Sequence, residues 1–143
     1  MKTKQVIWGV AAILAVGLIG LSVGLSVGQG NNPRIYELRT YTTLPGRLPA
    51  LHKRFAEHTM KLFEKHGIRN EMYWAPIDDA RKDNTLIYLL SHESKEAADR
   101  NWEAFYADPE WIRVRDASEA DGKILAKPPE RVFMTLTYFS PSR

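Results

Sequence analysis

The chain has 143 residues and contains no cysteine. This absence excludes disulfide bonds, thiolate metal sites and a cysteine nucleophile. The sequence also lacks a G-x-S-x-G motif, a phosphate-binding loop and the glycine fingerprint of dinucleotide-binding domains. The enzyme classes that depend on these motifs are therefore excluded, and we expect no cofactor.

A strong charge of one sign is missing as well. The 20 lysines and arginines include Lys2 and Lys4 of the N-terminal segment, which leaves 18 basic residues against 17 aspartates and glutamates. The rest of the chain is therefore nearly neutral, whereas nucleic-acid-binding domains carry a basic surface. We expect no nucleic-acid partner.

The N-terminus, by contrast, carries a long apolar run. Residues 1 to 5 are positively charged, and residues 6 to 28 contain no charge. A basic start, an apolar stretch and small residues near its end are typical of a secretory signal peptide. The run is also long enough for an uncleaved hydrophobic helix that anchors the protein in the membrane. In either case residues 1–30 predict export, with the following domain in the periplasm or at the outer face of the cytoplasmic membrane.

Residues 34–141 form the second predicted domain. Its strands are indicated by β-branched and aromatic residues, and its helices by apolar residues at helical spacing and by capping residues. The predicted order is strand 34–43, helix 47–66, strands 68–76 and 85–93, helix 95–107, a short helix from Asp108, and strand 131–139. This βαββαβ order with an extra short helix predicts a ferredoxin-like α+β fold, in which helices cover one face of a four-stranded antiparallel sheet.

The predicted strand 85–93 is apolar on both of its faces. Leu86, Tyr88 and Leu90 alternate with Ile87 and Leu89. A central strand with two apolar faces needs cover on both sides. Because the helices cover only one side and the chain is short, we expect a second subunit to cover the other and form a homodimer through the sheet faces.

Several stretches of this domain resemble the NIPSNAP family. They are YELRTY at 36–41, LFEKHGI at 62–68, SHES at 91–94 and WEAFYADPEW at 102–111, within a match from about residue 35 to residue 140. The resemblance implies a dimeric α+β barrel, in which two ferredoxin-like subunits pair their sheets. Similar barrels include antibiotic-biosynthesis monooxygenases and small isomerases, whose sites lie between helices and sheet. The family itself has no agreed reaction.

His58 is the strongest candidate for acid–base chemistry. It shares a predicted helix face with Leu51, Phe55 and Leu62, so it is expected to point towards the sheet. A histidine there could transfer protons at neutral pH. The alternative is a partly buried histidine that is satisfied by a backbone carbonyl or a neighbouring side chain.

Arg39 and four aromatic residues are further candidates for the wall of a ligand pocket. Arg39 lies on one strand face with Glu37 and Tyr41, where it could bind an anionic or carbonyl ligand or form an ion pair that fixes strand register. The aromatic candidates are Tyr73, Trp74, Tyr88 and Trp102. They could surround a small apolar ligand, or they could simply fill the core.

A metal site is not expected from the four histidines. His52 and His58 are six residues apart and point to different sides of the predicted helix, whereas helical metal ligands are three or four residues apart. In the stretch 102–111, Trp102 and Phe105 fall on the buried face of a helix, and Trp111 is expected to fold back on the core. This aromatic cluster predicts a lid that fixes the second helix to the sheet.

Two functions remain open. The first is a dimeric small-ligand-binding or interaction module that is exported, and held at the membrane through residues 6–28 if these are not cleaved. The second is a cofactor-independent enzyme of the monooxygenase or isomerase type, with His58 as acid or base. An internal cavity at His58 would favour the enzyme, and a filled core there would favour the binding module.

Overall fold

A computed structural model describes residues 34–141 of the chain. The predicted N-terminal hydrophobic helix, in residues 1–30, lies outside the described residues. Among residues 34–141, none of the helices is long and apolar enough to span a membrane. The elements follow in the order β1 (Ile35–Thr42), α1 (Leu48–Arg54), the π-helical segment η1 (Phe55–Thr59), α2 (Met60–Lys65), β2 (Arg69–Trp74), β3 (Thr85–His92), α3 (Lys95–Ala107), α4 (Pro109–Ser118) and β4 (Glu130–Met134).

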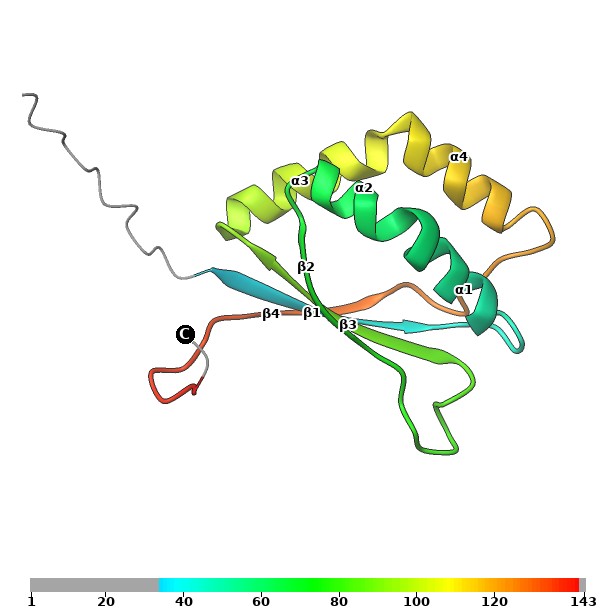
Figure 1. The fold of residues 1–143 in the computed structure, drawn as a ribbon, viewed down its shortest axis with the longest axis horizontal. Helices are drawn as coiled ribbons and strands as arrows, with labels where there is room; N and C mark the ends of the chain where they lie inside the picture. Colours follow the sequence, from blue (N-terminus) through cyan, green and yellow to red (C-terminus); the bar gives the residue numbers. More distant parts are fainter. Residues whose placement is uncertain (1–33, 142–143) are drawn as a thin grey trace, which may run out of the picture. The chain divides into compact units, whose positions relative to one another are not determined.

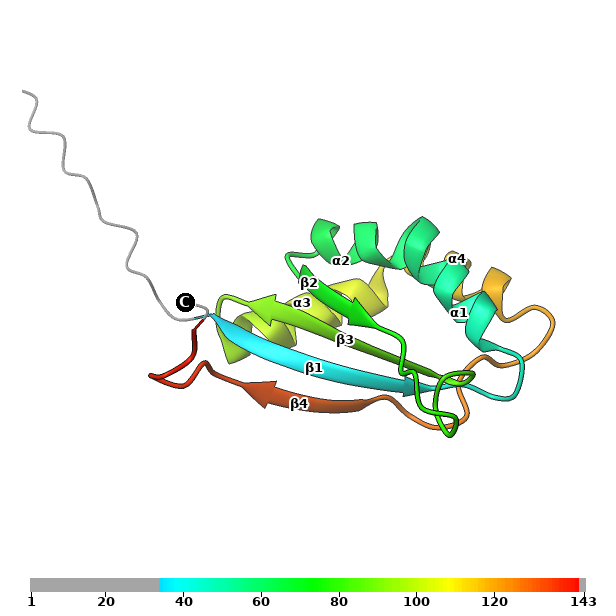
Figure 2. The same ribbon diagram turned by 60° about the horizontal axis from the view of Figure 1, so that its bottom comes forward.

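The four strands form one antiparallel sheet in the order β2-β3-β1-β4. All helices lie on one face of this sheet, and the opposite face is bare (Figures 1 and 2). The α+β fold with a four-stranded antiparallel sheet is therefore confirmed. The last strand is shorter than predicted and ends at Met134 instead of residue 139, because Met134 pairs with Tyr36 and β1 begins only one residue before Tyr36.

Side chains of the two central strands alternate strictly between the faces. On β1 the residues that face the helices are Glu37, Arg39 and Tyr41, and all three are buried. Tyr36, Leu38 and Thr40 face the bare side and are half-buried. On β3 the helix side is formed by Leu86, Tyr88, Leu90 and His92, whereas Ile87 and Leu89 lie on the bare side. The sheet therefore has one closed face and one open, largely apolar face.

Aromatic rings fill the space between the helices and the sheet. Phe63 of α2 lies in edge or tilted contact with Trp102 and Phe105 of α3, with ring centroids 5.3 and 4.9 Å apart. Phe105 in turn contacts Trp111 of α4 at 4.6 Å. Tyr88 of β3 stacks beneath Phe63 and is fully buried. Rings at these distances and angles stabilise one another beyond the area they bury. This layer is therefore a firm core, and it holds α3 against the sheet.

The first helix contains a wider turn that the sequence did not reveal. In the segment η1 the backbone N–H of Met60 donates to the carbonyl of Phe55, five residues earlier. A π-helical turn takes up one more residue than an α-helical turn. The side chain that faces the core after Phe55 is therefore Thr59, which is 1% exposed, and His58 is displaced from the inner face.

Asp108 joins two helices without a linker. It is the C-cap of α3 and also the N-cap of α4, where its Oδ1 accepts a hydrogen bond from the backbone N–H of Glu110 at 2.8 Å. Its other oxygen lies 2.6 Å from His66 Nε2 and 2.8 Å from Lys65 Nζ at the end of α2. These contacts lower the pKa of Asp108 well below its usual range, with the hydrogen bond from Lys65 as the largest cause.

Gly67 ends α2 in a Schellman motif. The N–H of Ile68 donates to the carbonyl of Phe63 at 2.9 Å, and Gly67 itself has a φ of 72°, which glycine adopts without strain. The side chain of Asn101 on α3 donates to the Gly67 carbonyl at 3.1 Å. The predicted glycine cap is therefore present, and it also connects α2 to α3.

The Gly67→Ala substitution should lower the free energy of unfolding by about 1–2 kcal/mol, because an L-residue is strained at this φ. It should cost more than Gly46→Ala, the matched control with a φ of 73°. At Gly67 an added Cβ would lie 3.0 Å from Asn101 Nδ2, whereas at Gly46 it would meet no atom within 4 Å. Urea unfolding of both variants checks this, and equal losses would show that the Asn101 contact is unimportant.

Candidate functional site

The buried carboxylate of Glu37 collects hydrogen bonds from three side chains. Its Oε1 accepts from Arg39 Nη1 at 2.8 Å, and its Oε2 accepts from Trp102 Nε1 at 2.7 Å and lies 2.9 Å from His92 Nε2. The four residues come from β1, β3 and α3. We call them the Glu37 cluster: Glu37, Arg39, His92 and Trp102.

Hydrogen bonds hold Glu37 in its ionised form. Burial alone would raise the pKa of this carboxyl group, but the hydrogen bonds from His92 and Trp102 and the charge of Arg39 outweigh it and lower the pKa below its ordinary value. An ionised carboxylate can only accept hydrogen bonds. In the hydrogen bond between His92 Nε2 and Glu37, the histidine is therefore the donor and the carboxylate the acceptor.

Arg39 lies between this carboxylate and the aromatic lid. Its guanidinium carbon is 4.3 Å from the centre of the Trp102 ring, which is close enough for a cation–π contact. Burial would lower the pKa of Arg39, but the neighbouring tyrosines Tyr41, Tyr88 and Tyr106 and the charge of Glu37 raise it. Tyr106 stacks on the outer side of Trp102 at 5.4 Å and is half exposed, so the cluster approaches the surface there.

The Glu37 cluster has the form of an acid–base pair but is closed to solvent. A carboxylate that orients one nitrogen of a histidine leaves the other available as a base. Here His92 Nδ1 has no hydrogen-bond partner among residues 34–141. However, Glu37 and His92 are fully buried and Arg39 is 3% exposed. In this arrangement the cluster fixes α3 to the sheet and is enclosed by it.

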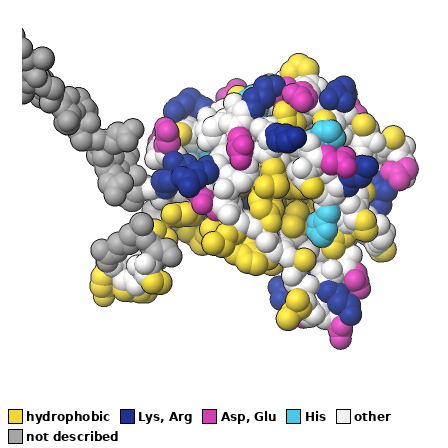
Figure 3. All heavy atoms as spheres, viewed as in Figure 1, with side chains coloured by type: hydrophobic (Ala, Val, Ile, Leu, Met, Phe, Trp, Pro, Cys, Tyr) yellow, Lys and Arg dark blue, Asp and Glu magenta, His cyan; other side chains and the backbone are white. Residues whose placement is uncertain are grey.

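Tyr73 and Trp74 line a hollow at the outer edge of β2. This hollow has a volume of about 250 Å³ and lies between β2 and the first helix, where Met60 and His52 form its other wall. Hydrophobic side chains gather between the helical layer and the strands on this side of the molecule (Figure 3). Tyr88 lies deeper, stacked on Tyr73 at 5.3 Å, and burial raises its pKa well above the ordinary value.

His58 lies at a third place, on a groove between the first helix and α4. Its side chain is 43% exposed and its Nε2 is 3.8 Å from Glu57 Oε2. The groove has a volume of about 400 Å³ and is also lined by Arg54. His58 therefore points away from the sheet, contrary to the expected orientation, because the π-helical turn shifts the helix face.

The structure thus distributes the predicted pocket residues over three regions. Arg39 and Trp102 belong to the Glu37 cluster with Tyr88 beside it, Tyr73 and Trp74 share the edge hollow, and His58 lies on the groove. Within residues 34–141, no three His, Asp or Glu side chains are grouped so that they could hold a metal ion.

Sequence reasoning missed two buried polar residues, His92 and Arg54. The strand alternation contains the signal for His92, because it lies two positions after Leu90 on the face that points to the helices. Arg54 lies three positions after Leu51 on the inner face of α1. Both signals were available from spacing alone, but a charged residue on a buried face is the less common case.

The strand order β2-β3-β1-β4, with helices on one face only, defines a ferredoxin-like α+β domain. The family model that matches this chain is NIPSNAP, over residues 36–141. The match covers most of the chain, so this protein belongs to the NIPSNAP family. A comparison with curated protein sequences finds no match.

Solved structures share this fold at low sequence identity. A NIPSNAP family protein of unknown function from Agrobacterium tumefaciens is 21% identical, with a TM-score of 0.63 over 78% of this chain and 95% of that one. A NIPSNAP-like domain protein from Burkholderia xenovorans is 19% identical, with a TM-score of 0.65 over 77% and 90%. The cofactor-independent oxygenase SnoaB from Streptomyces nogalater is 14% identical, with a TM-score of 0.50 over 76% and 98%. These similarities establish the fold.

The Glu37→Gln substitution should lower the free energy of unfolding by about 3–5 kcal/mol, because it leaves the buried guanidinium of Arg39 without its counter-charge. The double variant Glu37→Gln with Arg39→Met should recover more than half of this loss, since no unpaired charge remains. The control is Glu103→Gln on the exposed side of α3, which should change stability by less than about 0.5 kcal/mol. Urea unfolding measures all three, and a loss below about 1 kcal/mol for Glu37→Gln would contradict the anchoring role.

Proposed function

We propose that this NIPSNAP protein is an exported dimeric module that binds a small ligand or a partner and pairs with its copy sheet to sheet. The observation that carries the proposal is the open face of the sheet. This face presents apolar side chains from all four strands, and no helix of the described domain covers it: Tyr36, Leu38, Met72, Trp74, Ile87, Leu89, Val132 and Met134.

The exposure of these residues supports an interface between subunits. Met72, Trp74 and Val132 lie on the outer strands and are 57, 44 and 56% exposed. Soluble proteins rarely leave a contiguous apolar patch of this kind uncovered. Two copies of the same face can pair about a twofold axis, and such pairing would bury the apolar side chains of both faces.

The chain beyond β4 adds further apolar surface. Leu136 and Phe139 are 42 and 70% exposed in the segment that follows Met134. This segment continues from the outer strand of the open face (Figure 2). It therefore extends the surface available to a partner subunit at the β4 edge.

The filled interior favours a binding module over an enzyme with an internal active site. The rings of Phe63, Tyr88 and Phe105 occupy the layer between helices and sheet, where similar barrels have their pockets. The acid–base pair of Glu37 and His92 is enclosed in the same layer. Ligands would therefore bind at the surface hollows and grooves.

The proposal of export rests on residues 1–30. Their positive start and uncharged stretch predict either a cleaved signal or a retained anchor, and both place the domain outside the cytoplasm. Native mass spectrometry of the protein purified in mild detergent from its source cells distinguishes the two by mass. A retained leader would place the dimer at the membrane, and a full-length protein found only in the cytoplasm would overturn export.

The full chain should be a dimer in native mass spectrometry, and Leu89→Lys should convert it to a monomer. Leu89 lies in the middle of the open face, so each interface would bury two lysine charges at a cost of several kcal/mol. The control is Ile112→Lys, an apolar and exposed position on α4 away from the open face, which should remain dimeric. A monomeric wild-type protein, or a dimeric Leu89→Lys variant, would exclude pairing through this face.

A second candidate function is a cofactor-independent enzyme that uses His58 as acid or base. The observation in its favour is that His58 lines a groove and is accessible, with Glu57 beside it. SnoaB, with the same fold, is a cofactor-independent oxygenase. If this function holds, His58→Ala abolishes turnover of a bound compound without changing its affinity or the fold.

A further inference from the structure

The groove between the first helix and α4 contains a buried cation at its floor. One wall comes from α1 and η1, and the other from α4 and the loop after it. We call this the α1–α4 groove and define it by its lining residues: Ala50, Lys53, Arg54, Glu57, His58, Arg113, Val114, Ala117, Ser118, Ala120 and Asp121. Its volume of about 400 Å³ is in the range of small-molecule sites.

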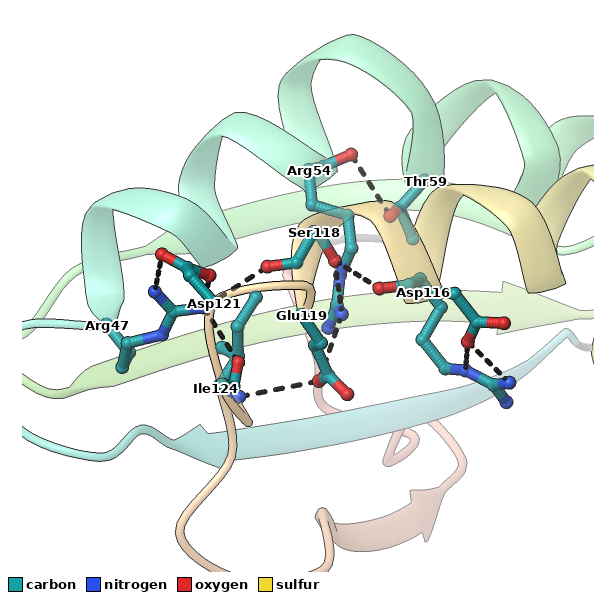
Figure 4. A network of polar contacts seen from close by, with 10 residues as sticks. Arg47, Arg54, Thr59, Asp116, Ser118, Glu119, Asp121 and Ile124 are labelled. Atoms are coloured by element: carbon teal, nitrogen blue, oxygen red, sulfur yellow. Dashed lines mark hydrogen bonds and ion pairs between the residues drawn. The ribbon is translucent and has the colours of Figure 1, made fainter.

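Arg54 is buried there without a full set of hydrogen-bond partners. Its side chain is 4% exposed, and its Nε has no hydrogen-bond partner among the described residues. Nη1 donates to Ser118 Oγ at 3.1 Å and reaches Glu119 Oε1 only at 3.4 Å (Figure 4). The same carboxylate oxygen also accepts the backbone N–H of Ile124 at 3.4 Å.

Two other arginines show how this chain satisfies a guanidinium when the partner is internal. Arg39 is paired with Glu37 at 2.8 Å. Arg47 makes two hydrogen bonds to the carboxylate of Asp121, both at 2.8 Å, and two more to backbone carbonyls (Figure 4). The Nε atom lacks a partner among residues 34–141 in all three arginines, but the ion pair of Arg54 with Glu119 is longer, at 3.4 Å, so the charge of Arg54 is the least compensated of the three.

Burial therefore dominates the electrostatics of Arg54. It lowers the pKa of this guanidinium, and the opposing effects of Tyr41 and Glu119 do not restore it. Arg39, which is also buried, has a raised pKa because of its neighbours. A buried guanidinium presents a planar fork of donors that matches a carboxylate. A carboxylate in the groove would add a second counter-charge to the distant one of Glu119.

The charges around Arg54 leave the groove open to an anion. The two acidic lining residues are already paired, Asp121 with Arg47 at 2.8 Å and Glu57 with Lys53 at 3.4 Å. Arg113 makes no ion pair among residues 34–141 and adds a further cation to the α4 wall.

The remaining walls are small and apolar. Ala50 faces the groove from α1, and Val114 and Ala117 face it from α4. Short side chains at these positions leave room for a ligand body and exclude water from one side of it. A cation at the floor and apolar walls above it fit a molecule that has one carboxylate and a compact hydrophobic part.

The π-helical segment adds a local reason why Arg54 and the groove lie where they do. η1 begins directly after Arg54, and the hydroxyl of Thr59 donates to the Arg54 carbonyl at 3.2 Å. π-helical turns are frequent at functional sites because they redirect side chains. Here the wider turn moves His58 to the groove wall, so it aligns a histidine with the buried arginine.

We propose that the α1–α4 groove binds a small organic monocarboxylate, with the carboxylate on Arg54 and the hydrophobic part against Ala50, Val114 and Ala117. The proposal rests on the proposed function as a binding module and names its site and ligand class. It does not depend on pairing of the sheets, because the helices lie on the opposite face.

Isothermal titration of the full chain in mild detergent with phenylacetate tests the site. Wild-type protein should bind phenylacetate, and its neutral analogue phenylacetamide should bind at least about tenfold more weakly, because it lacks the charge that Arg54 requires. Inorganic phosphate has the charge but no hydrophobic part, so it should compete poorly. No binding of phenylacetate, equal binding of phenylacetamide, or displacement by phosphate at equal concentration would each overturn the proposal.

Arg54→Met is the variant that assigns the site. It keeps the length of the side chain and removes the charge, and it should weaken phenylacetate binding by about tenfold or more. The matched control Lys61→Gln removes an exposed charge from α2, outside the groove, and should leave binding unchanged within about twofold. Unchanged affinity in Arg54→Met would overturn the assignment.

Two further measurements separate this proposal from others. If Arg54→Met fails to fold, Arg54→Lys replaces it, because lysine keeps a buried cation but lacks the planar fork of donors. Arg54→Lys should bind phenylacetate more weakly than wild type. An unchanged affinity would overturn the role of the fork. In native mass spectrometry Arg54→Met should show the same oligomeric state as wild type. A dimer that does not bind phenylacetate refutes only the groove, whereas a monomer that binds it refutes only sheet pairing.

Discussion

The structure depends on one buried carboxylate. Glu37 has no contact with solvent, and a charge in such a place is tolerated only when hydrogen bonds and a counter-charge replace water. Arg39, His92 and Trp102 provide both. These partners come from two strands and a helix. The contacts that compensate the charge of Glu37 therefore also hold α3 on the sheet. Trp102 also belongs to the aromatic layer, so the layer and the charged cluster share one anchor.

Closure of one sheet face has a direct effect on where function can reside. Since the helix side is filled by rings and by the Glu37 cluster, the surfaces that remain accessible are the open face and the spaces between helices. The open face is continuous and apolar, which suits a second subunit. The α1–α4 groove is smaller and contains an incompletely paired cation, which suits a small molecule. The two surfaces lie on opposite sides of the sheet and can act independently.

Much of the fold could be predicted from the sequence, whereas the site could not. Strand alternation in Leu86 to Leu90 and the capping residues Gly67 and Asp108 gave the sheet, its two faces and the helix boundaries. Local rules failed at His58, because a single π-helical turn shifts the helical phase and leaves no signature in apolar spacing. They also failed for the partners of Glu37, since Trp102 is 65 residues away and only the folded chain brings the two together. The spacing from Leu51 places Arg54 on the inner face of α1, but a charged residue on a buried face is the less common case, so spacing alone did not single it out.

Asp108 has a mechanical consequence for the groove. Because one residue ends α3 and begins α4, there is no slack between the two helices, and the contacts to Lys65 and His66 fasten their corner to α2. α4 cannot swing like a flap on a flexible hinge. The other end of α4 is fastened as well, because Arg47 binds the carboxylate of Asp121 and the carbonyls of Ser118 and Gly122. The groove therefore lies along a helix that is held at both of its ends, and its width is set by these two sets of contacts.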